Sequence, residues 1–511
     1  MGNSWRYDRA KDAIDRRIKD VKTIDIVDYK RDTSLESIPT NKAYRVHGVH
    51  MYADILNLSD ILGTTDTEGE RCHKRALRFL NLHQREVHRI LNRCDARRVD
   101  FHNQRLHSLI TKPYGTDEEK KRVVRAVAIG KLIIDVLAET GDDDDDIPNA
   151  KVRIGVDTGL ALAVNNGRNG NREPLFLGSP ANHAAKLASN WKAEGIFLTN
   201  TARTVAGFEE VDEGTEGTSP LTRDEIKKCQ DEAKLDVTKD EIVKEWRQDN
   251  ENNPIGSFVF SRPTPPLKNL NISSLTPGNS RRMEAVSVYA DIDNFTKYVA
   301  DNIDDNAEDV VRCFHVIRSE MDRTLSSDFS GRRIRFIGDC IHGLLMEGTA
   351  YATDDEESVS TATLCVGALR SSFDLTLERL EANGIGAKSL GIQIGFEFGP
   401  MTVTRLGMQG DRVRCSVSRG GVASEAEQCR CTGAETSIGQ VAFDASTGAV
   451  RKLFGKTRKI KNLNYDLAVD SLTADGDKVA KVATIAAYVI PAPAMAKAVE
   501  QPFRPYSEHC E

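Results

Sequence analysis

An internal repeat constrains this chain more than any other feature. Three short motifs of the first half return in the same order in the second half, about 235 to 240 residues later. Such a repeat indicates a duplicated structural unit, so the 511 residues are expected to form two related domains, each with its own core. The matching segments are VHMYADILN (49–57) and VSVYADIDN (286–294), RRVDFHNQRLHSLI (97–110) and RRIRFIGDCIHGLL (332–345), and RIGVDTG (153–159) and QIGFEFG (393–399).

Each copy shows the same succession of hydrophobic patterns. A β-branched strand ends in Ala-Asp-Ile, and a long segment with apolar residues at helical spacing follows it. Two short strands with a tight turn come next, around residues 97–111 and 332–347, and then a second helix and a strand that ends in glycine. The succession predicts an α+β fold with helices packed against a mainly antiparallel sheet.

The repeat and the local composition divide the chain. Residues 263–283 are rich in Pro, Ser and Asn, which is typical of a linker. The amphipathic stretch RAKDAIDRRIKDV suits a docking helix, a dimerisation helix or a surface helix, and residues 212–253 suit a polar helical insertion. The expected parts are an N-terminal helical extension (1–40), the first domain (41–262), the linker (263–283), the second domain (284–495) and a C-terminal tail (496–511).

The composition of the chain excludes some classes of binding partner. The net charge is -7, so no general affinity for nucleic acid or for an anionic membrane is expected. No apolar run approaches the roughly 20 residues that span a bilayer. The first residues, MGNSWRYDRAKD, lack the apolar segment of a signal peptide. These features together predict a cytosolic protein.

Two carboxylates of the second copy are the candidate metal ligands. Asp291 ends an apolar strand, and Asp339 follows Gly338 in the turn of the next predicted hairpin. Because the first strand can lie beside that hairpin, the two side chains can converge. Paired carboxylates that hold hard divalent cations, beside a polar turn whose N–H groups can meet a triphosphate, are suited to phosphoryl chemistry.

These motifs give the chain a specific resemblance. YADIDNFT and RFIGD resemble the two metal motifs of class III adenylyl and guanylyl cyclases, and QIGFEFGPMTV resembles the strand that follows them. The resemblance implies two divalent cations, Mn²⁺ or Mg²⁺, held by Asp291, the carbonyl of Ile292 and Asp339. It also implies a phosphate-binding turn formed by Asn294, Phe295 and Thr296. The family usually has Gly where Asn294 stands, and Asn tolerates left-handed backbone best after Gly.

The first copy resembles the other part of a cyclase site. RIGVDTGLALAV and FLGSPANHAAKLAS are similar to the family's next strand and to its Asn-x-x-x-Arg helix. The likeness implies that Asn182 orients the ribose and that Lys186, in the Arg position, stabilises charge on the α-phosphate. The two residues are four apart, so they share one face of a helix. Lysine keeps the cation but lacks the planar fork of arginine.

The two copies have lost complementary parts. The first has Asp54 but carries Gln104 at the second metal position, and the second has Gly421 and Glu425 where Asn182 and Lys186 stand in the first. Cyclases of this class build their sites across a two-fold interface. The resemblance therefore implies two tandem, ferredoxin-like βαββαβ domains that form an intramolecular pseudo-dimer with one working site and one dead site.

The base contacts are off the usual pattern. By the resemblance, Asp100 and Leu175 face the base, and they match neither the adenylyl nor the guanylyl set. A carboxylate can accept a hydrogen bond from guanine, uracil or cytosine but is a poor partner for N1 of adenine. With the two-domain layout, this resembles the bacterial pyrimidine cyclases of Pycsar anti-phage systems, which make cyclic UMP or cyclic CMP for a downstream effector. UTP is favoured over CTP because uridylate cyclases form the larger part of that family.

Two other functions stay open from the sequence. One is a guanylate cyclase with unusual base contacts. The other is a catalytically inactive cyclase fold that serves as a nucleotide sensor or scaffold, an interpretation to which Gln104 and Lys186 lend weight. The sequence also leaves open whether the protein is a monomer or a homodimer, because the duplication supplies both halves of a site.

Overall fold

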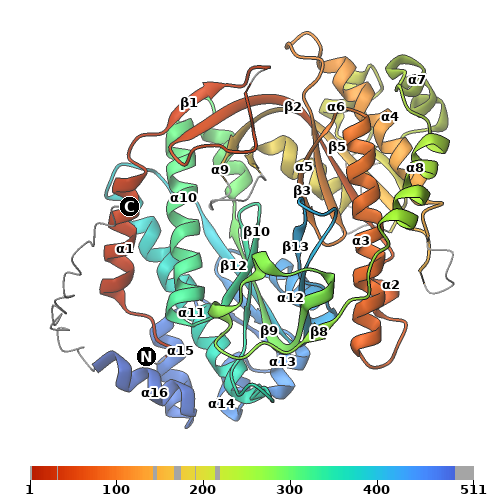
Figure 1. Ribbon diagram of the computed structural model, residues 1–511. Helices are drawn as coiled ribbons and strands as arrows, with labels where there is room; N and C mark the ends of the chain where they lie inside the picture. Colours follow the sequence, from red (N-terminus) through yellow and green to blue (C-terminus); the bar gives the residue numbers. More distant parts are fainter. Residues whose placement is uncertain are drawn as a thin grey trace, which may run out of the picture.

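Two mixed sheets, one from each half of the sequence, organise the protein (Figure 1). The computed structural model describes residues 3–31, 33–141, 147–165, 174–189, 192–212 and 219–488. Within these residues the first sheet has seven strands and the second has eight. The predicted C-terminal tail, residues 496–511, lies outside the described part of the chain.

The first sheet has the strand order β3-β4-β2-β5-β6, and its neighbours in this order are antiparallel. Two further strands are parallel to their partners, β1 beside β2 and β7 beside β5. The strands are β1 (Asp25–Asp28), β2 (Lys42–Ile55), β3 (Arg97–His102), β4 (Arg105–Ile110), β5 (Val152–Val164), β6 (Leu175–Leu177) and β7 (Gly195–Leu198).

The second sheet repeats this arrangement in the order β10-β11-β9-β12-β14-β15. Its β8 is parallel to β9, its β14 is parallel to β12, and β13 is antiparallel to β12. Both hairpins even shift register at the same place, between Arg98 and Asp100 and between Arg333 and Arg335. The strands are β8 (Phe260–Ser261), β9 (Ser280–Asp293), β10 (Arg332–Ile337), β11 (Cys340–Leu345), β12 (Gly391–Leu406), β13 (Val413–Cys415), β14 (Glu435–Ile438) and β15 (Lys459–Lys461).

Helices take equivalent places in the two halves, so the predicted α+β succession is confirmed. In the first half they are α2 (Leu58–Leu62), α3 (Glu70–Arg93), α4 (Glu119–Leu137), α5 (Ser179–Ala188) and α6 (Asn200–Ala206). In the second half they are α9 (Phe295–Asn302), α10 (Ala307–Arg323), α11 (Asp355–Glu381), α12 (Arg419–Cys429), α13 (Gln440–Ala445), α14 (Gly448–Phe454), α15 (Tyr465–Ala474) and α16 (Lys478–Tyr488). A π-helical turn, Thr324–Asp328, extends α10.

A pair of equivalent glycines sets the position of the two short helices that carry the candidate site. A Cβ atom on Gly155 of β5 would lie 2.2 Å from the carbonyl oxygen of Ala184 in α5. A Cβ atom on Gly395 of β12 would lie 2.1 Å from the backbone nitrogen of Gln428 in α12. Since no side chain fits there, α5 and α12 lie directly on the strands beneath them.

The N-terminal extension docks on the second half of its own chain. Helix α1 (Tyr7–Asp20) lies beside α10 and α11 (Figure 1) and buries Ala10, Ile14 and Ile18. Polar contacts fix it, including an Arg9–Glu320 ion pair at 2.5 Å and an Asp15–Arg379 ion pair at 2.7 Å. Of the roles that the amphipathic pattern left open, the structure shows internal docking.

The segment predicted as a linker is packed rather than free. Three short 3₁₀ turns, Leu267–Asn269, Ile272–Ser274 and Pro277–Asn279, follow β8, and β9 already begins at Ser280. Leu267, Ile272 and Leu275 are buried in a small core with residues of β9, β10, β11 and β12. Residues 263–283 contain few apolar residues, and these are widely spaced, so their burial was not predicted from the sequence.

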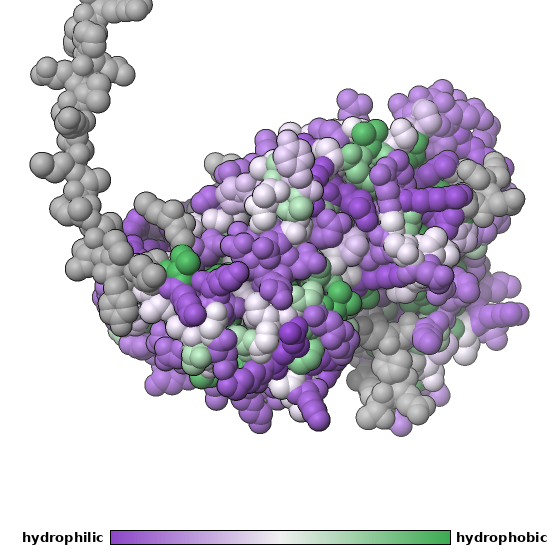
Figure 2. Space-filling view, turned by 90° about the horizontal axis from the view of Figure 1, so that it is seen from below, coloured by the Kyte–Doolittle hydropathy of each residue, from purple (hydrophilic) through white to green (hydrophobic). Residues whose placement is uncertain are grey.

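The polar insertion of the first half is helical, as predicted. It forms α7 (Arg223–Ala233) and α8 (Lys239–Asn252), and each begins with a capping box, Thr222 with Glu225 and Thr238 with Glu241. Among the described residues, no helix is both long and apolar enough to cross a membrane. The face of the molecule shown in Figure 2 is mainly hydrophilic, with its hydrophobic residues scattered in small groups.

Candidate active site

The hairpin of the second sheet brings the two predicted metal carboxylates together. Strand β11 is antiparallel to β9 with Ile341 opposite Ala290, so the β10–β11 turn that carries Asp339 lies beside Asp291 near the end of β9. Both residues are half-buried. Burial raises the pKa of Asp291 well above its usual value, and the charge of Asp339 adds to the effect. Burial also raises the pKa of Asp339 to about 7.

This donor set suits a hard divalent cation. Two neighbouring carboxylates that are partly withdrawn from water destabilise each other's charge, and a cation between them would remove that repulsion. In the described part of the chain, no group of three or more His, Cys, Asp and Glu side chains is arranged to hold a metal. The set predicted from the sequence differs from such a group, because it has two carboxylates and one backbone carbonyl, that of Ile292.

The turn after β9 has the backbone shape that its sequence predicts. Asn294 is left-handed, with φ of 64° and ψ of 10°, and it stands directly before α9. Its side-chain amide donates to the carbonyl of Ser389 at 3.1 Å. The ring of Phe295 is buried and lies 5.7 Å from the ring of Phe314. At these two positions, therefore, the backbone N–H groups are the donors that could face a phosphate.

A direct contact joins the predicted site residues of the two halves. The amide of Asn182, in the first turn of α5, donates to the hydroxyl of Thr296 at the start of α9, at 2.6 Å. Lys186 follows one turn later on α5, is exposed, and together with Arg318 acts to lower the pKa of Asp339 against the larger effect of burial. The structure thus brings Asn182, Lys186 and the second-half residues Thr296 and Asp339 to one place.

The position predicted to read the base holds an ion pair. Asp100 of β3 binds the guanidinium of Arg335, the residue at the equivalent place in β10, and Arg335 also donates to the carbonyl of Phe101 at 2.6 Å. Burial lowers the pKa of Arg335 to about 9. Leu175, at the start of β6, is half-buried and packs against the core formed mainly by the second half. Arg335 was not predicted as a site residue from the sequence. The opposite charges at the equivalent positions of RRVDF and RRIRF were the signal that could have identified it.

At the equivalent place on the other side, an ion pair joins the two halves. Arg105, next to Gln104, forms an ion pair with Glu425, the counterpart of Lys186. Although burial opposes its charge, Glu425 and Asp54 raise the pKa of Arg105 above its usual value. Burial also raises the pKa of Asp54, to about 6. Here a guanidinium stands next to the carboxylate that would otherwise bind a metal.

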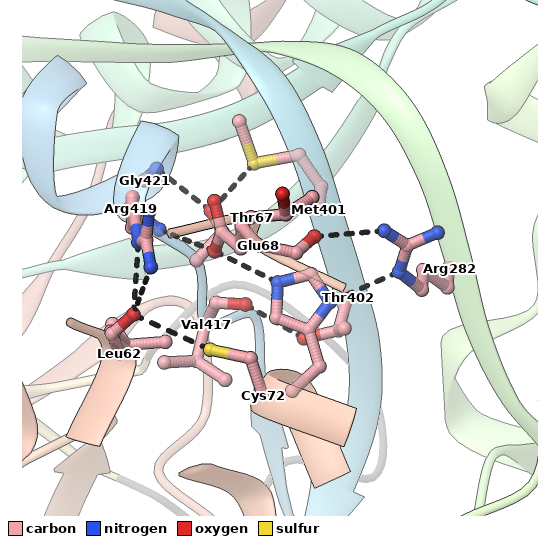
Figure 3. Close-up of polar contacts among 12 residues, drawn as sticks. Leu62, Thr67, Glu68, Cys72, Arg282, Met401, Thr402, Val417, Arg419 and Gly421 are labelled. Carbon is pink, nitrogen blue, oxygen red and sulfur yellow. Dashed lines mark hydrogen bonds and ion pairs between the residues drawn. The ribbon is translucent and has the colours of Figure 1, made fainter. Parts of the chain in front are cut away.

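The N-terminus of α12 is covered by the loop between α2 and α3 (Figure 3). The carboxylate of Glu68 accepts from the backbone N–H of Arg419 at 2.7 Å and contacts Nε2 of His73 at 2.8 Å. The Arg419 guanidinium donates to the carbonyl of Leu62 at 2.6 Å. Arg282 of β9 donates to Nδ1 of His73 at 3.2 Å. These contacts surround the start of α12, the helix equivalent to α5.

Comparison with known proteins gives two relatives that match most of the chain. The chain is 62% identical over 509 residues to a uridylate cyclase of Pseudomonas aeruginosa, covering 99% of this chain and 98% of that protein. It is 38% identical over 446 residues to a uridylate cyclase of a Rhizobium species, covering 83% of each. No family model matches the sequence.

A solved structure agrees in fold. The crystal structure of a class III adenylyl cyclase-like ATP-binding protein from Pseudomonas aeruginosa superposes with a TM-score of 0.90 and 64% identity, covering 92% of this chain and 100% of that chain. The repeated sheets, the paired carboxylates and these relatives lead to one conclusion: the chain belongs to the class III cyclase family, in the group of the uridylate cyclases.

Proposed function

We propose that this protein is a uridylate cyclase that converts UTP to 3′,5′-cyclic UMP and pyrophosphate. The observation that carries the proposal is the 62% identity to a uridylate cyclase over nearly the whole of both chains. It favours UTP over the CTP and GTP alternatives that the residues at the base position left open. An inactive sensor is the alternative of another class, and the experiment below separates it from an enzyme.

The site is proposed to lie between two tandem cyclase domains, residues 41–262 and 284–495, in an intramolecular pseudo-dimer. The equal strand order of the two sheets and the hydrogen bond from Asn182 to Thr296 support this arrangement. A single site per chain follows, because the equivalent place holds the Arg105–Glu425 pair instead of a cation on α12.

In this proposal Asp291, the carbonyl of Ile292 and Asp339 hold two Mn²⁺ or Mg²⁺ ions. When bound, the ions lower the pKa of the ribose 3′-hydroxyl and neutralise phosphate charge. Asn182 orients the ribose, and the ammonium of Lys186 stabilises negative charge on the α-phosphate. The backbone N–H groups of the Asn294–Thr296 turn receive the phosphate chain.

The reaction makes one bond and breaks another. The 3′-oxygen attacks the α-phosphorus, the bond from this phosphorus to the bridging oxygen breaks, and pyrophosphate leaves. The hydroxyl proton passes to solvent, so no separate protein base is required. Asp100 and Leu175 are proposed to face the uracil, where the carboxylate of Asp100, already oriented by Arg335, can accept from the N3–H of the base.

The test is incubation of the full chain with each of the four nucleoside triphosphates and Mn²⁺, followed by mass detection of cyclic monophosphates. Cyclic UMP is expected as the main product, and Asp291→Asn is expected to abolish it. Asp54→Asn is the matched control, because it makes the same change at the equivalent position outside the proposed site, and it should keep the cyclic UMP formation that Asp291→Asn loses.

Two results would contradict the proposal. No cyclic product from the wild type with any of the four nucleotides would favour the sensor, and equal losses in Asp291→Asn and Asp54→Asn would contradict a single site. The cytosolic location, the role in anti-phage defence, the downstream effector and the choice between monomer and homodimer stay predictions from the sequence.

A further inference from the structure

A cavity beside α10 and strand β10 is lined mainly by positively charged side chains. Its volume is about 400 Å³, and it lies between α10, the π-helical turn that extends α10, strand β10 and the N-terminal extension. Four arginines and a single aspartate line it: Arg17 from α1, Arg318 and Arg323 from α10, Arg333 from β10, and Asp322. We call it the arginine cavity.

Two of these guanidinium groups are held close together inside the protein. Arg318 and Arg333 are 4% and 6% exposed, and their central carbons lie 3.6 and 4.2 Å from the centre of the Phe336 ring. Burial first, and then the charge of Arg333, lower the pKa of Arg318 well below its usual value. Asp322 approaches Arg333 at 3.4 Å, and the charges of Asp322 and Asp339 act on Arg318 against the effect of burial. An anion in the cavity would stabilise both cations.

The rest of the lining fits an oxyanion. The π-helical turn brings Ser326 and Ser327 to the cavity, and Ser319 and Thr40 add two further hydroxyl groups. His315 stays neutral, because burial and then the charges of Arg17 and Arg318 lower its pKa to about 3. π-Helical turns often mark functional sites. The first half lacks this turn, since α3 ends at Arg93 and β3 begins at Arg97.

We infer that the arginine cavity binds a phosphate-bearing anion, of the size of a di- or triphosphate, outside the proposed active site. Guanidinium groups present planar, two-pronged donors that match phosphate oxygens, and hydroxyl groups complete such sites. Two sources share this chemistry, namely free pyrophosphate and the phosphate chain of a nucleotide.

The cavity is electrically linked to the metal position. The charge of Arg318 acts on Asp339 and lowers its pKa against the larger effect of burial. Arg17 and Thr40 belong to the N-terminal extension, which gives residues 1–40 a place in this link.

Isothermal titration calorimetry of the full chain with pyrophosphate, inorganic triphosphate and UTP, in low salt with EDTA, tests the inference. EDTA removes the cations that the proposed active site needs for a phosphate chain. One equivalent of anion is expected to bind, and Arg17→Gln, at the half-exposed edge of the cavity, should weaken binding about tenfold, the effect of one charge-assisted contact. The three titrants distinguish free pyrophosphate from the nucleotide as the ligand.

Two further variants serve as controls for this measurement. Arg16→Gln removes an exposed charge of the same helix that does not line the cavity, and it should bind like the wild type. Lys186→Gln should also bind like the wild type, because it alters only the active site. Absence of binding by the wild type, equal losses in Arg17→Gln and Arg16→Gln, or loss in Lys186→Gln would each overturn the inference. Turnover is not measured, so the outcome is independent of the proposed function.

Discussion

At the scale of the residue, equivalent positions of the two copies carry opposite chemistry. Lys186 on α5 faces the side of the paired carboxylates, whereas Glu425 at the same place on α12 is bound to Arg105. Asp100 and Arg335, also equivalent, bind each other. Since a triphosphate is attracted by an ammonium and repelled by a carboxylate, the proposed site lies on the side of Lys186.

The role of Lys186 can be tested by changing its charge and its shape separately. Lys186→Gln should lower kcat/KM for UTP by roughly 10²- to 10³-fold, the cost of losing one electrostatic contact to a transition state. Lys186→Arg keeps the cation and should stay within about tenfold of the wild type. Rates of cyclic UMP formation measure both, and Lys239→Gln, which removes a surface charge on α8, is the control. Equal losses in Lys186→Gln and Lys186→Arg would contradict a purely electrostatic role.

Residues that act through a local pattern could be predicted from the sequence. The convergence of Asp291 with Asp339 and the left-handed backbone of Asn294 follow from strand ends and a turn, and the structure has both. Ion pairs between distant residues leave no such pattern. Arg335 and Asp100 are 235 residues apart, and Arg105 and Glu425 are 320 apart, so only the fold brings these pairs together.

At the scale of the element, buried charged side chains of helix α3 contact the helical insertion. Arg85 and Arg89 both bind Asp249 of α8, at 2.5 and 2.8 Å. Glu86, between them, has a fully buried side chain with Arg89 at 3.4 Å. Burial raises the pKa of Glu86 to about 8, although Arg89 acts in the opposite direction.

Glu86 predicts a pH dependence of stability. Below about pH 4 this side chain is protonated in both the folded and the unfolded chain and contributes no difference. As the pH rises toward 8, the unfolded chain ionises Glu86 freely while the folded chain keeps it protonated, so the free energy of unfolding falls. The Glu86→Gln variant has no carboxyl group to titrate at this position, so its free energy of unfolding does not fall in this way. Its stability relative to the wild type should therefore grow, by about 3 kcal/mol, between pH 5.5 and 8.5.

Thermal unfolding of both proteins at the two pH values measures the difference. Glu251→Gln, a change of an exposed residue on α8, should show no comparable growth with pH. A difference between Glu86→Gln and the wild type that is the same at pH 5.5 and pH 8.5 would contradict the assignment of the effect to Glu86.

The succession of elements was largely readable from the sequence, whereas their docking was not. The repeat predicted both hairpins and the strand that follows each of them, and the polar pattern of residues 212–253 predicted the helical insertion. The docking of α1 on α10 and α11, and the burial of Leu267, Ile272 and Leu275, depend on surfaces that only the folded second half provides. Composition described these segments correctly as polar and amphipathic but did not identify what they contact.

At the scale of the whole molecule, each half completes the core of the other. Ala43, Leu162 and Leu177 of the first half lie in the core formed mainly by the second. Leu406 and Val417 of the second half lie in the core formed mainly by the first. The Arg105–Glu425 ion pair also joins the two halves. The cluster around Glu68 joins them as well (Figure 3).

A charge exchange tests whether the Arg105–Glu425 pair joins the halves. Arg105→Glu puts a carboxylate beside Glu425 and Asp54 and should destabilise the protein by about 2–4 kcal/mol, the cost of breaking a partly buried ion pair. Adding Glu425→Arg should recover at least half of that loss. Thermal unfolding measures the stability of the single and double variants. An additive loss in the double variant would show that the two side chains do not act as a pair.

The hydrogen bond between Asn182 and Thr296 has a consequence for how the protein behaves when it is scarce. Both residues belong to one polypeptide, so the encounter of the two halves is intramolecular and its effective concentration is set by the chain. An enzyme whose halves were separate subunits would lose specific activity on dilution. Under the proposed single-chain site, the specific activity of cyclic UMP formation should therefore stay constant when the protein is diluted, and an assay over a wide range of protein concentrations measures this.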